Sequence, residues 1–205
     1  MNNSLRPVPL HWPALLVATL VATASVNTPA RADTSPYEVQ AQGSRCVGSE
    51  GRDSAGKSAV DDREIRWTEE TKYDDARKHS NRAWSSHGLE QVAIRADVWN
   101  TSNDLIWKDK NKGDGALATY SRNPNLGKTD VIHMNDYYLK AGRPGDWDST
   151  VWRRFAAAHE FGHALGLCHK NPDQGATIMT ANARYAADNK PTRRDRGDYH
   201  KIWGN

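Results

Sequence analysis

One short run in the second half of the chain constrains it more than any other feature: residues 159–169 read HEFGHALGLCH. His159 and His163 are four positions apart, so on a helix they lie one turn apart on the same face, where two imidazoles can bind one metal ion. Gly166 tolerates the backbone angles of a sharp turn, which would bring His169 round as a third ligand. Three neutral imidazoles leave one tetrahedral position for water, as in a catalytic zinc site rather than a closed structural one.

Two further residues fit this interpretation. Glu160 directly follows the first histidine and is well placed to act as a general base on metal-bound water. Met179 lies in the segment ATIMT, a short distance after the third histidine. An isolated methionine usually fills a gap in a core, so Met179 gains significance only from its position after the histidines.

Residues 159–179 resemble the signature of the metzincin metallopeptidases, in which a methionine turn follows the zinc-binding helix. The similarity is greatest to the matrixin branch in its bacterial-type, secreted form, because the third ligand of matrixins is also a histidine. Over about residues 60–205 the resemblance continues more weakly. Residues 114–120 and 130–135 resemble the matrixin substrate-edge strand and the strand after it, and residues 195–204 resemble the last helix.

The matrixin resemblance implies a zinc-dependent endopeptidase, in which a zinc-bound water assisted by Glu160 hydrolyses the peptide bond. A peptide or protein substrate would add a strand to the sheet edge near Leu117 and Ala118, although plain sheet packing explains these two residues equally well. The resemblance also places the methionine turn at Met179. It assigns one catalytic Zn²⁺ to three ligands: His159, His163 and His169.

The resemblance does not extend to further metal sites. Matrixins carry a histidine in the edge strand for a second, structural zinc, but this chain has Thr119 and Tyr120 there, so no second zinc is expected. His133, alone in a predicted strand, is expected to be packed or to face solvent. Calcium is compatible with the family, but the acidic residues in the loops are too scattered to identify a site. These acids are Asp109, Asp114 and Asp130.

Two rival functions also fit a zinc site, and the first of them keeps the same metal chemistry. One is a secreted zinc hydrolase that acts on a non-protein or cell-wall amide and differs from a peptidase only in its cleft. The other is a non-catalytic, zinc-binding secreted protein. The intact Glu160 argues against it, because a structural site has no use for that carboxylate.

The resemblance also places four residues near the family's main specificity pocket, where their small size suggests room for an apolar substrate side chain: Ile178, Thr180, Ala181 and Asn182.

Residues 1–32 have the features of a secretory signal peptide. Arg6 gives a weakly positive start, residues 13–26 form a short apolar run, and residues 30–32 (ARA) offer a small-x-small cleavage site. We expect cleavage after Ala32 and a secreted, extracellular protein. The apolar run is too short for a stable membrane anchor, although an uncleaved signal anchor stays open as an alternative.

The chain has two cysteines, Cys46 and Cys168. An even count in an exported chain favours one disulfide between them. Two alternatives stay open. The segment RCVG around Cys46 is a poor match to the matrixin prodomain segment whose thiolate caps the zinc, and the two thiols can also both be free.

After a lead-in segment at residues 33–62, residues 63–205 are expected to form one catalytic domain. The order of strand-like and helix-like runs favours an α+β fold. Together with the resemblance, it indicates a zincin/metzincin-like domain with a twisted mixed sheet of about five strands, an active-site helix carrying HExxH, a methionine turn and a C-terminal helix. The predicted strands are 64–68, 92–99, 104–108, 116–121 and 130–134, and the predicted helices are 73–87, 151–167 and 192–203.

The charge of the chain gives no support for a nucleic-acid partner. The formal net charge is +3, but residues 1–32 carry two basic residues and no acidic one, so the remaining chain is close to neutral. Proteins that bind nucleic acid through its phosphates carry a clear basic excess. We therefore expect a peptide or protein substrate and no nucleic acid, and we expect the protein to be a monomer.

Overall fold

The computed structural model of the chain describes residues 40–42, 52–123, 125, 128–143, 145–186 and 188–205. The chain divides into two compact units, residues 1–33 and 34–205, and every described residue belongs to the second unit. The predicted signal peptide and Cys46 lie outside the described residues, so the signal peptide and the disulfide stay predictions. In the described part, no helix has the length and apolar character needed to cross a membrane.

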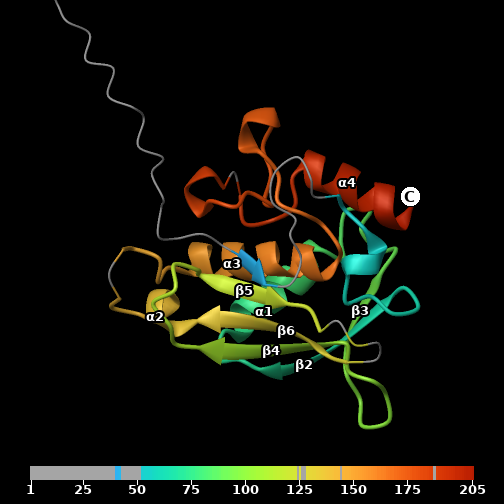
Figure 1. Ribbon diagram of the computed structural model, residues 1–205, viewed down its shortest axis with the longest axis horizontal. Helices are drawn as coiled ribbons and strands as arrows, with labels where there is room; N and C mark the ends of the chain where they lie inside the picture. The colour runs from blue at the N-terminus through green and yellow to red at the C-terminus, as the bar shows by residue number, and fades with distance from the viewer. Residues whose placement is uncertain (1–39, 43–51, 124, 126–127, 144, 187) are drawn as a thin grey trace, which may run out of the picture. The chain divides into compact units, whose positions relative to one another are not determined.

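A mixed six-stranded sheet forms the centre of the second unit, with the strand order β1-β5-β6-β4-β2-β3 (Figure 1). Neighbouring strands are parallel except β5 and β6, which are antiparallel. The α+β class and the mixed sheet are therefore confirmed. The strands are β1 (Gln40–Gln42), β2 (Glu64–Glu70), β3 (Ala93–Ala96), β4 (Leu105–Lys110), β5 (Ala118–Ser121) and β6 (Asp130–Asn135).

The five strands predicted from the sequence correspond to β2–β6. Strand β1 is additional: it lies in the lead-in segment and pairs in parallel with β5, with Ala41 opposite Tyr120. No periodic pattern marks β1, because a three-residue edge strand is too short to show one.

Within the residues that the structure describes, four α-helices accompany the sheet: α1 (Asp74–Ala83), α2 (Asp136–Leu139), α3 (Thr150–Ala164) and α4 (Arg193–Trp203). Helix α4 begins with a capping box, in which the Thr192 hydroxyl and the Asp195 carboxylate each accept from the other residue's backbone N–H. Gly204 ends it at a φ of 85°. Single-turn 3₁₀ helices lie at η2 (Ala55–Lys57), η3 (Pro172–Gln174) and η4 (Ala183–Tyr185).

Two helices end earlier than their sequence patterns predict. Helix α1 stops at Ala83, and the chain then passes through positive φ angles at His87 (56°) and Gly88 (87°). Helix α3 stops at Ala164, and Gly166 has a φ of 89°. After α3 the apolar pattern continues because Leu165 and Leu167 are buried in the following loop, whereas after α1 Trp84 is buried but residues 85–88 are not.

Large aromatic side chains join the helices to the sheet. Trp107, in the central strand β4, is fully buried and stacks on Phe161 of α3 with ring centroids 6.1 Å apart. Helix α1 packs along α3 (Figure 1). The indole of Trp84, just after α1, donates a hydrogen bond of 2.7 Å to the carbonyl of Ala158. These contacts fix α3, which carries the histidine motif, against both the sheet and α1.

Candidate metal centre

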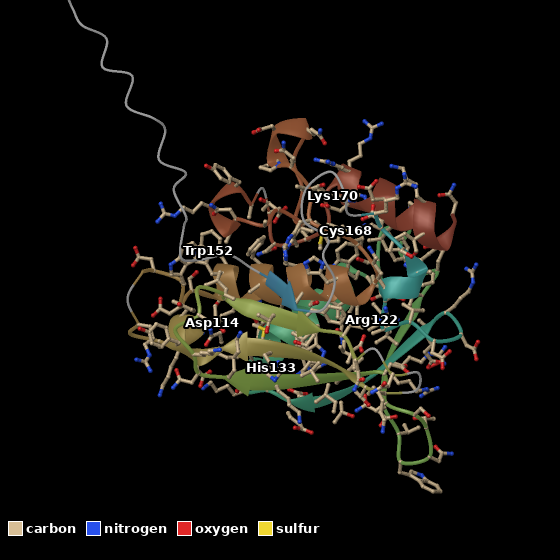
Figure 2. All side chains as sticks on the ribbon, viewed as in Figure 1. Asp114, Arg122, His133, Trp152, Cys168 and Lys170 are labelled. Atoms are coloured by element: carbon tan, nitrogen blue, oxygen red, sulfur yellow. The ribbon has the colours of Figure 1, made fainter. Side chains whose placement is uncertain are left out.

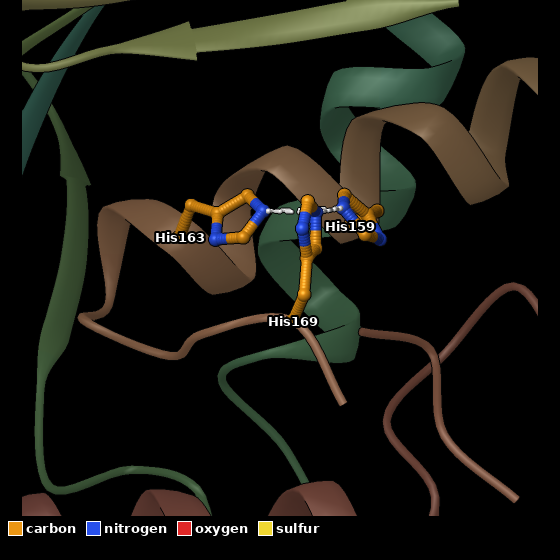
Figure 3. A group of neighbouring side chains, drawn as sticks. All are labelled: His159, His163 and His169. Atoms are coloured by element: carbon orange, nitrogen blue, oxygen red, sulfur yellow. Dashed lines mark hydrogen bonds between the residues drawn. The ribbon is translucent and has the colours of Figure 1, made fainter. Parts of the chain in front are cut away.

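The three histidines of the sequence motif converge at the end of α3. His159 and His163 lie one turn apart on the helix, and His169 comes back from the segment after the helix (Figure 3). Their Nε2 atoms are 3.1–3.2 Å apart in all three pairs. These ligand atoms form a group that can hold one metal ion.

The glycine turn that brings His169 back is sterically required. At Gly166, with a φ of 89°, an added Cβ would lie 2.3 Å from the carbonyl oxygen of Ser54. A hydrogen bond of 2.9 Å from the Ser54 N–H to the Gly166 carbonyl holds the two backbone segments together at this point. A residue with a side chain would meet both backbone strain and a clash at this position.

The hydrogen bonds of the ring nitrogens suit a cation. His159 Nδ1 lies 2.8 Å from the carbonyl of Ile178, and His163 Nδ1 lies 2.7 Å from the carbonyl of Leu167. Because a carbonyl only accepts, we assign the ring protons to Nδ1, which leaves the Nε2 lone pairs facing one another. Lone pairs at this separation repel unless a cation lies between them. Three nitrogens bound tetrahedrally at zinc distances are about 3.3–3.4 Å apart, close to the observed spacing.

Burial keeps the two helical histidines in the form that binds metal. His159 is fully buried, and His163 is nearly so. The pKa of each ring is lowered well below its usual value, first by burial and then by the neighbouring imidazoles. Both rings are therefore neutral at pH 7 and have a lone pair to donate.

Glu160, which follows His159 in α3, is fully buried. Its Oε2 accepts a hydrogen bond of 2.6 Å from the backbone N–H of Tyr120 in β5. Its Oε1 is also buried and accepts no hydrogen bond from the described residues. Burial raises the pKa of this carboxyl well above its usual value. A buried acceptor without a donor costs free energy, so the orphaned oxygen indicates a position where water or a substrate group is meant to bind.

Met179 packs against α3, the helix that carries His159 and His163. A Cβ added at Gly162, between the two histidine turns, would lie 2.4 Å from the Met179 sulfur. The carbonyl of Met179 accepts a hydrogen bond of 2.7 Å from the N–H of Lys170, the residue after the third histidine. The methionine segment therefore touches both parts of the chain that carry ligands.

Asp195 is a supporting residue that the sequence motifs do not reveal. Its carboxylate is fully buried and accepts from the Ile178 N–H (2.9 Å) and the Thr177 hydroxyl (2.5 Å). Because the Ile178 carbonyl in turn accepts from His159, Asp195 orients a metal ligand through one residue. Nothing in the local sequence shows this, since the partners are distant along the chain.

The predicted substrate-edge residues lie at the start of β5. Leu117 and Ala118 are both fully buried, and Ala118 pairs with Met134 of β6. On the other side of β5, strand β1 pairs with residues 119–121. In the segment around Met179, Ile178 and Thr180 are buried, whereas Ala181 and Asn182 are partly exposed.

His133 lies on the sheet, away from the histidine triad. Figure 2 shows it in β6, whereas Cys168 and Lys170 lie on the other side of α3. Its ring is half-buried, and its pKa is lowered by burial and by the nearby lysines, Lys110 and Lys108. This cationic surrounding does not suit a second metal ion.

The three loop acids are held by donors of the protein. Asp109 accepts from the Lys72 N–H (3.1 Å), and Asp114 pairs with Lys110 at 2.9 Å. Asp130 accepts from the Tyr120 hydroxyl and from the Asn123 N–H. Each carboxylate has a different set of partners, so the three are structural hydrogen-bond acceptors at separate places.

Comparisons with known proteins add no argument about function. No family model matches the chain, and no curated protein sequence matches it. Among solved structures, the chain is similar to a chain of one described as the "GM1 bound form of the ECX AB5 holotoxin". The two share 14% identity over 68% of this chain and 80% of that chain, with a TM-score of 0.45. A similarity this weak leaves the geometry of the site as the basis for assigning function.

Proposed function

We propose that this protein is a zinc-dependent endopeptidase of the metzincin type. The observation that carries the proposal is the convergence of the Nε2 atoms of His159, His163 and His169. Glu160 follows His159 directly in the same helix, and its buried carboxylate has one oxygen without a hydrogen-bond donor among the described residues. Three imidazoles at tetrahedral spacing favour zinc over magnesium or calcium, which prefer oxygen ligands. Bound there, zinc would polarise the scissile carbonyl and make water a better nucleophile.

The chain's own residues supply the proton transfers. Glu160 takes a proton from water as the water oxygen attacks the carbonyl carbon, and it passes this proton to the amine as the carbon–nitrogen bond breaks. The Tyr120 N–H holds one carboxylate oxygen at 2.6 Å. This contact leaves the other oxygen, Oε1, as the one that exchanges the proton.

The edge of β5 supports an extended peptide as the substrate. Strand β1 pairs along residues 119–121, so the outer edge of β5 has backbone groups that accept an added strand. A peptide that adds at this edge would run next to Tyr120, whose N–H also holds Glu160. A substrate strand and β1 would exclude each other over residues 119–121, so we infer that β1 gives way when substrate binds near Leu117 and Ala118.

Export remains part of the proposal. Cleavage after Ala32 would release a monomeric, extracellular protein. A disulfide between Cys46 and Cys168 would tie the lead-in segment to the residue just before the third ligand.

The test is a peptidase assay on purified protein that begins after Ala32, with Glu160→Gln beside the unchanged chain. We expect casein or gelatin cleavage that a chelator abolishes and added zinc restores. Glu160→Gln should keep stoichiometric zinc by elemental analysis and lose at least about 100-fold in kcat, because general-base catalysis contributes about that much or more. Glutamine has nearly the same size and shape as glutamate, so this change removes the base while it preserves the packing of the side chain.

Other outcomes would replace this proposal. Cleavage of cell-wall amides without cleavage of protein would indicate a zinc hydrolase of another substrate class. Bound zinc without any hydrolysis would indicate a non-catalytic zinc protein. Full activity in Glu160→Gln would remove the general-base role.

A further inference from the structure

A hollow of about 210 Å³ lies between the C-terminal end of α1 and the segment that leads into α4. Three permanently charged side chains line it, each from a different part of the chain: Arg82 of α1, Lys190 of the preceding loop and Arg196 of α4. Among the described residues, no carboxylate lines the hollow. It shares no residue with the histidine triad.

None of these three cations forms an ion pair with a carboxylate of the described residues. Other basic residues form ion pairs with carboxylates: Arg154 lies 2.9 Å from Asp75, and Arg77 lies 2.9 Å from Glu69. Arg82, Lys190 and Arg196 take part in none of the ion pairs formed by the described residues. Like charges around one hollow repel each other, and an anion would relieve this repulsion.

The acids of α4 are engaged elsewhere. Asp195 is buried against Thr177 and Ile178, on the metal-site side of the helix. Asp198 lies 2.7 Å from Lys201 and 3.4 Å from Lys170. Arg196 is therefore left facing the hollow without a carboxylate from its own helix.

Two hydrogen bonds hold parts of the walls of the hollow together. His79 Nε2 lies 2.7 Å from the carbonyl of Asn189, which ties the loop to α1. The guanidinium of Arg196 donates one bond of 3.1 Å to the carbonyl of Pro191 and keeps its remaining N–H groups. Leu89 and Pro191, both buried, form an apolar floor. Pre-organised donors reduce the entropy lost on binding.

We propose that this hollow is a binding site for a phosphate or sulfate group carried by a ligand. A guanidinium matches the geometry of two oxyanion oxygens, and a lysine adds a point charge. The apolar floor would contact the organic part of an ester. The site is separate from the metal centre, so the inference does not depend on the peptidase function.

The experiment is titration calorimetry of the chain that begins after Ala32, at constant ionic strength. Inorganic phosphate and sulfate are the first probes, with chloride as the control for general screening. Glucose 6-phosphate and a sulfated heparin disaccharide then distinguish the two sources of the oxyanion. We expect saturable binding of one ligand per chain, and the tighter of the two esters identifies the source.

The test variant is Arg82→Gln with Lys190→Gln, because both side chains are exposed and their replacement should leave the fold intact. Its matched control is Arg95→Gln with Lys112→Gln, which removes the same charge from exposed positions elsewhere. We expect at least a tenfold loss of affinity in the test variant and less than a twofold change in the control. Absence of saturable binding, or equal affinity in both variants, would overturn the proposal.

Discussion

At the scale of single residues, Asp195 connects the C-terminal helix to the metal centre. Its carboxylate holds the Ile178 N–H and the Thr177 hydroxyl, and the Ile178 carbonyl orients His159. In Asp195→Asn an N–H₂ group replaces one acceptor oxygen and faces a donor. Partners of metal ligands typically contribute 10–100-fold to metal affinity. We therefore expect zinc affinity to fall by about tenfold or more, measured by competition with a chromogenic chelator.

A matched change elsewhere separates this effect from the loss of a charge. Asp173→Asn removes a carboxylate from an exposed position in η3 whose side chain makes no hydrogen bond to the described residues. Its zinc affinity should equal that of the unchanged chain. If Asp195→Asn also bound zinc normally while folded, the positioning role of Asp195 would be wrong.

At the scale of elements, the sequence predicts the helices, strands and turns that are determined by residues close together in the chain. The spacing of His159, His163 and His169 is itself the geometry of a helix and a turn, so the ligand set follows from sequence alone. The five strands β2–β6 show in runs of alternating or apolar residues. The sequence does not reveal that Asp195 supports His159 or that the Tyr120 N–H holds Glu160. Both roles depend on contacts between residues that are distant in sequence.

The turn that ends α3 is the element most sensitive to substitution. At Gly166 an alanine combines a positive φ with a contact of 2.3 Å to the Ser54 carbonyl. Left-handed backbone costs about 1–2 kcal/mol for a residue with a Cβ, and overpacking typically adds about 1–3 kcal/mol. We expect Gly166→Ala to lower the free energy of unfolding by about 2–5 kcal/mol in urea denaturation.

Gly142 provides the control for this change. It has a similar φ of 78°, but an added Cβ there would meet nothing within 4 Å. Gly142→Ala should therefore show the backbone penalty alone, about 1–2 kcal/mol. Equal losses in the two variants would show that the contact with Ser54 contributes nothing.

At the scale of the whole molecule, segments far apart in sequence meet around the third ligand. Asp53 accepts a hydrogen bond of 2.8 Å from the Cys168 N–H and also contacts the ammonium of Lys170. The Lys170 N–H bonds to the Met179 carbonyl, and Lys170 also lies 3.4 Å from Asp198 of α4. The lead-in segment, the end of α3, the methionine segment and α4 therefore all converge on the residues beside His169.

This convergence predicts that metal binding and folding are coupled. At a free zinc concentration a thousandfold above Kd, binding adds about 4 kcal/mol to the folded state, which corresponds to about 10 °C in Tm for a domain of this size. We expect a chelator to lower the Tm by about this amount in calorimetry, and added zinc to restore it. Glu160→Gln keeps all three ligands and should respond in the same way, whereas His169→Ala should begin at the lower Tm and respond little. If the chelator did not change the Tm of the unchanged chain, the three rings would hold no ion, since a cation that binds only the folded state must stabilise that state.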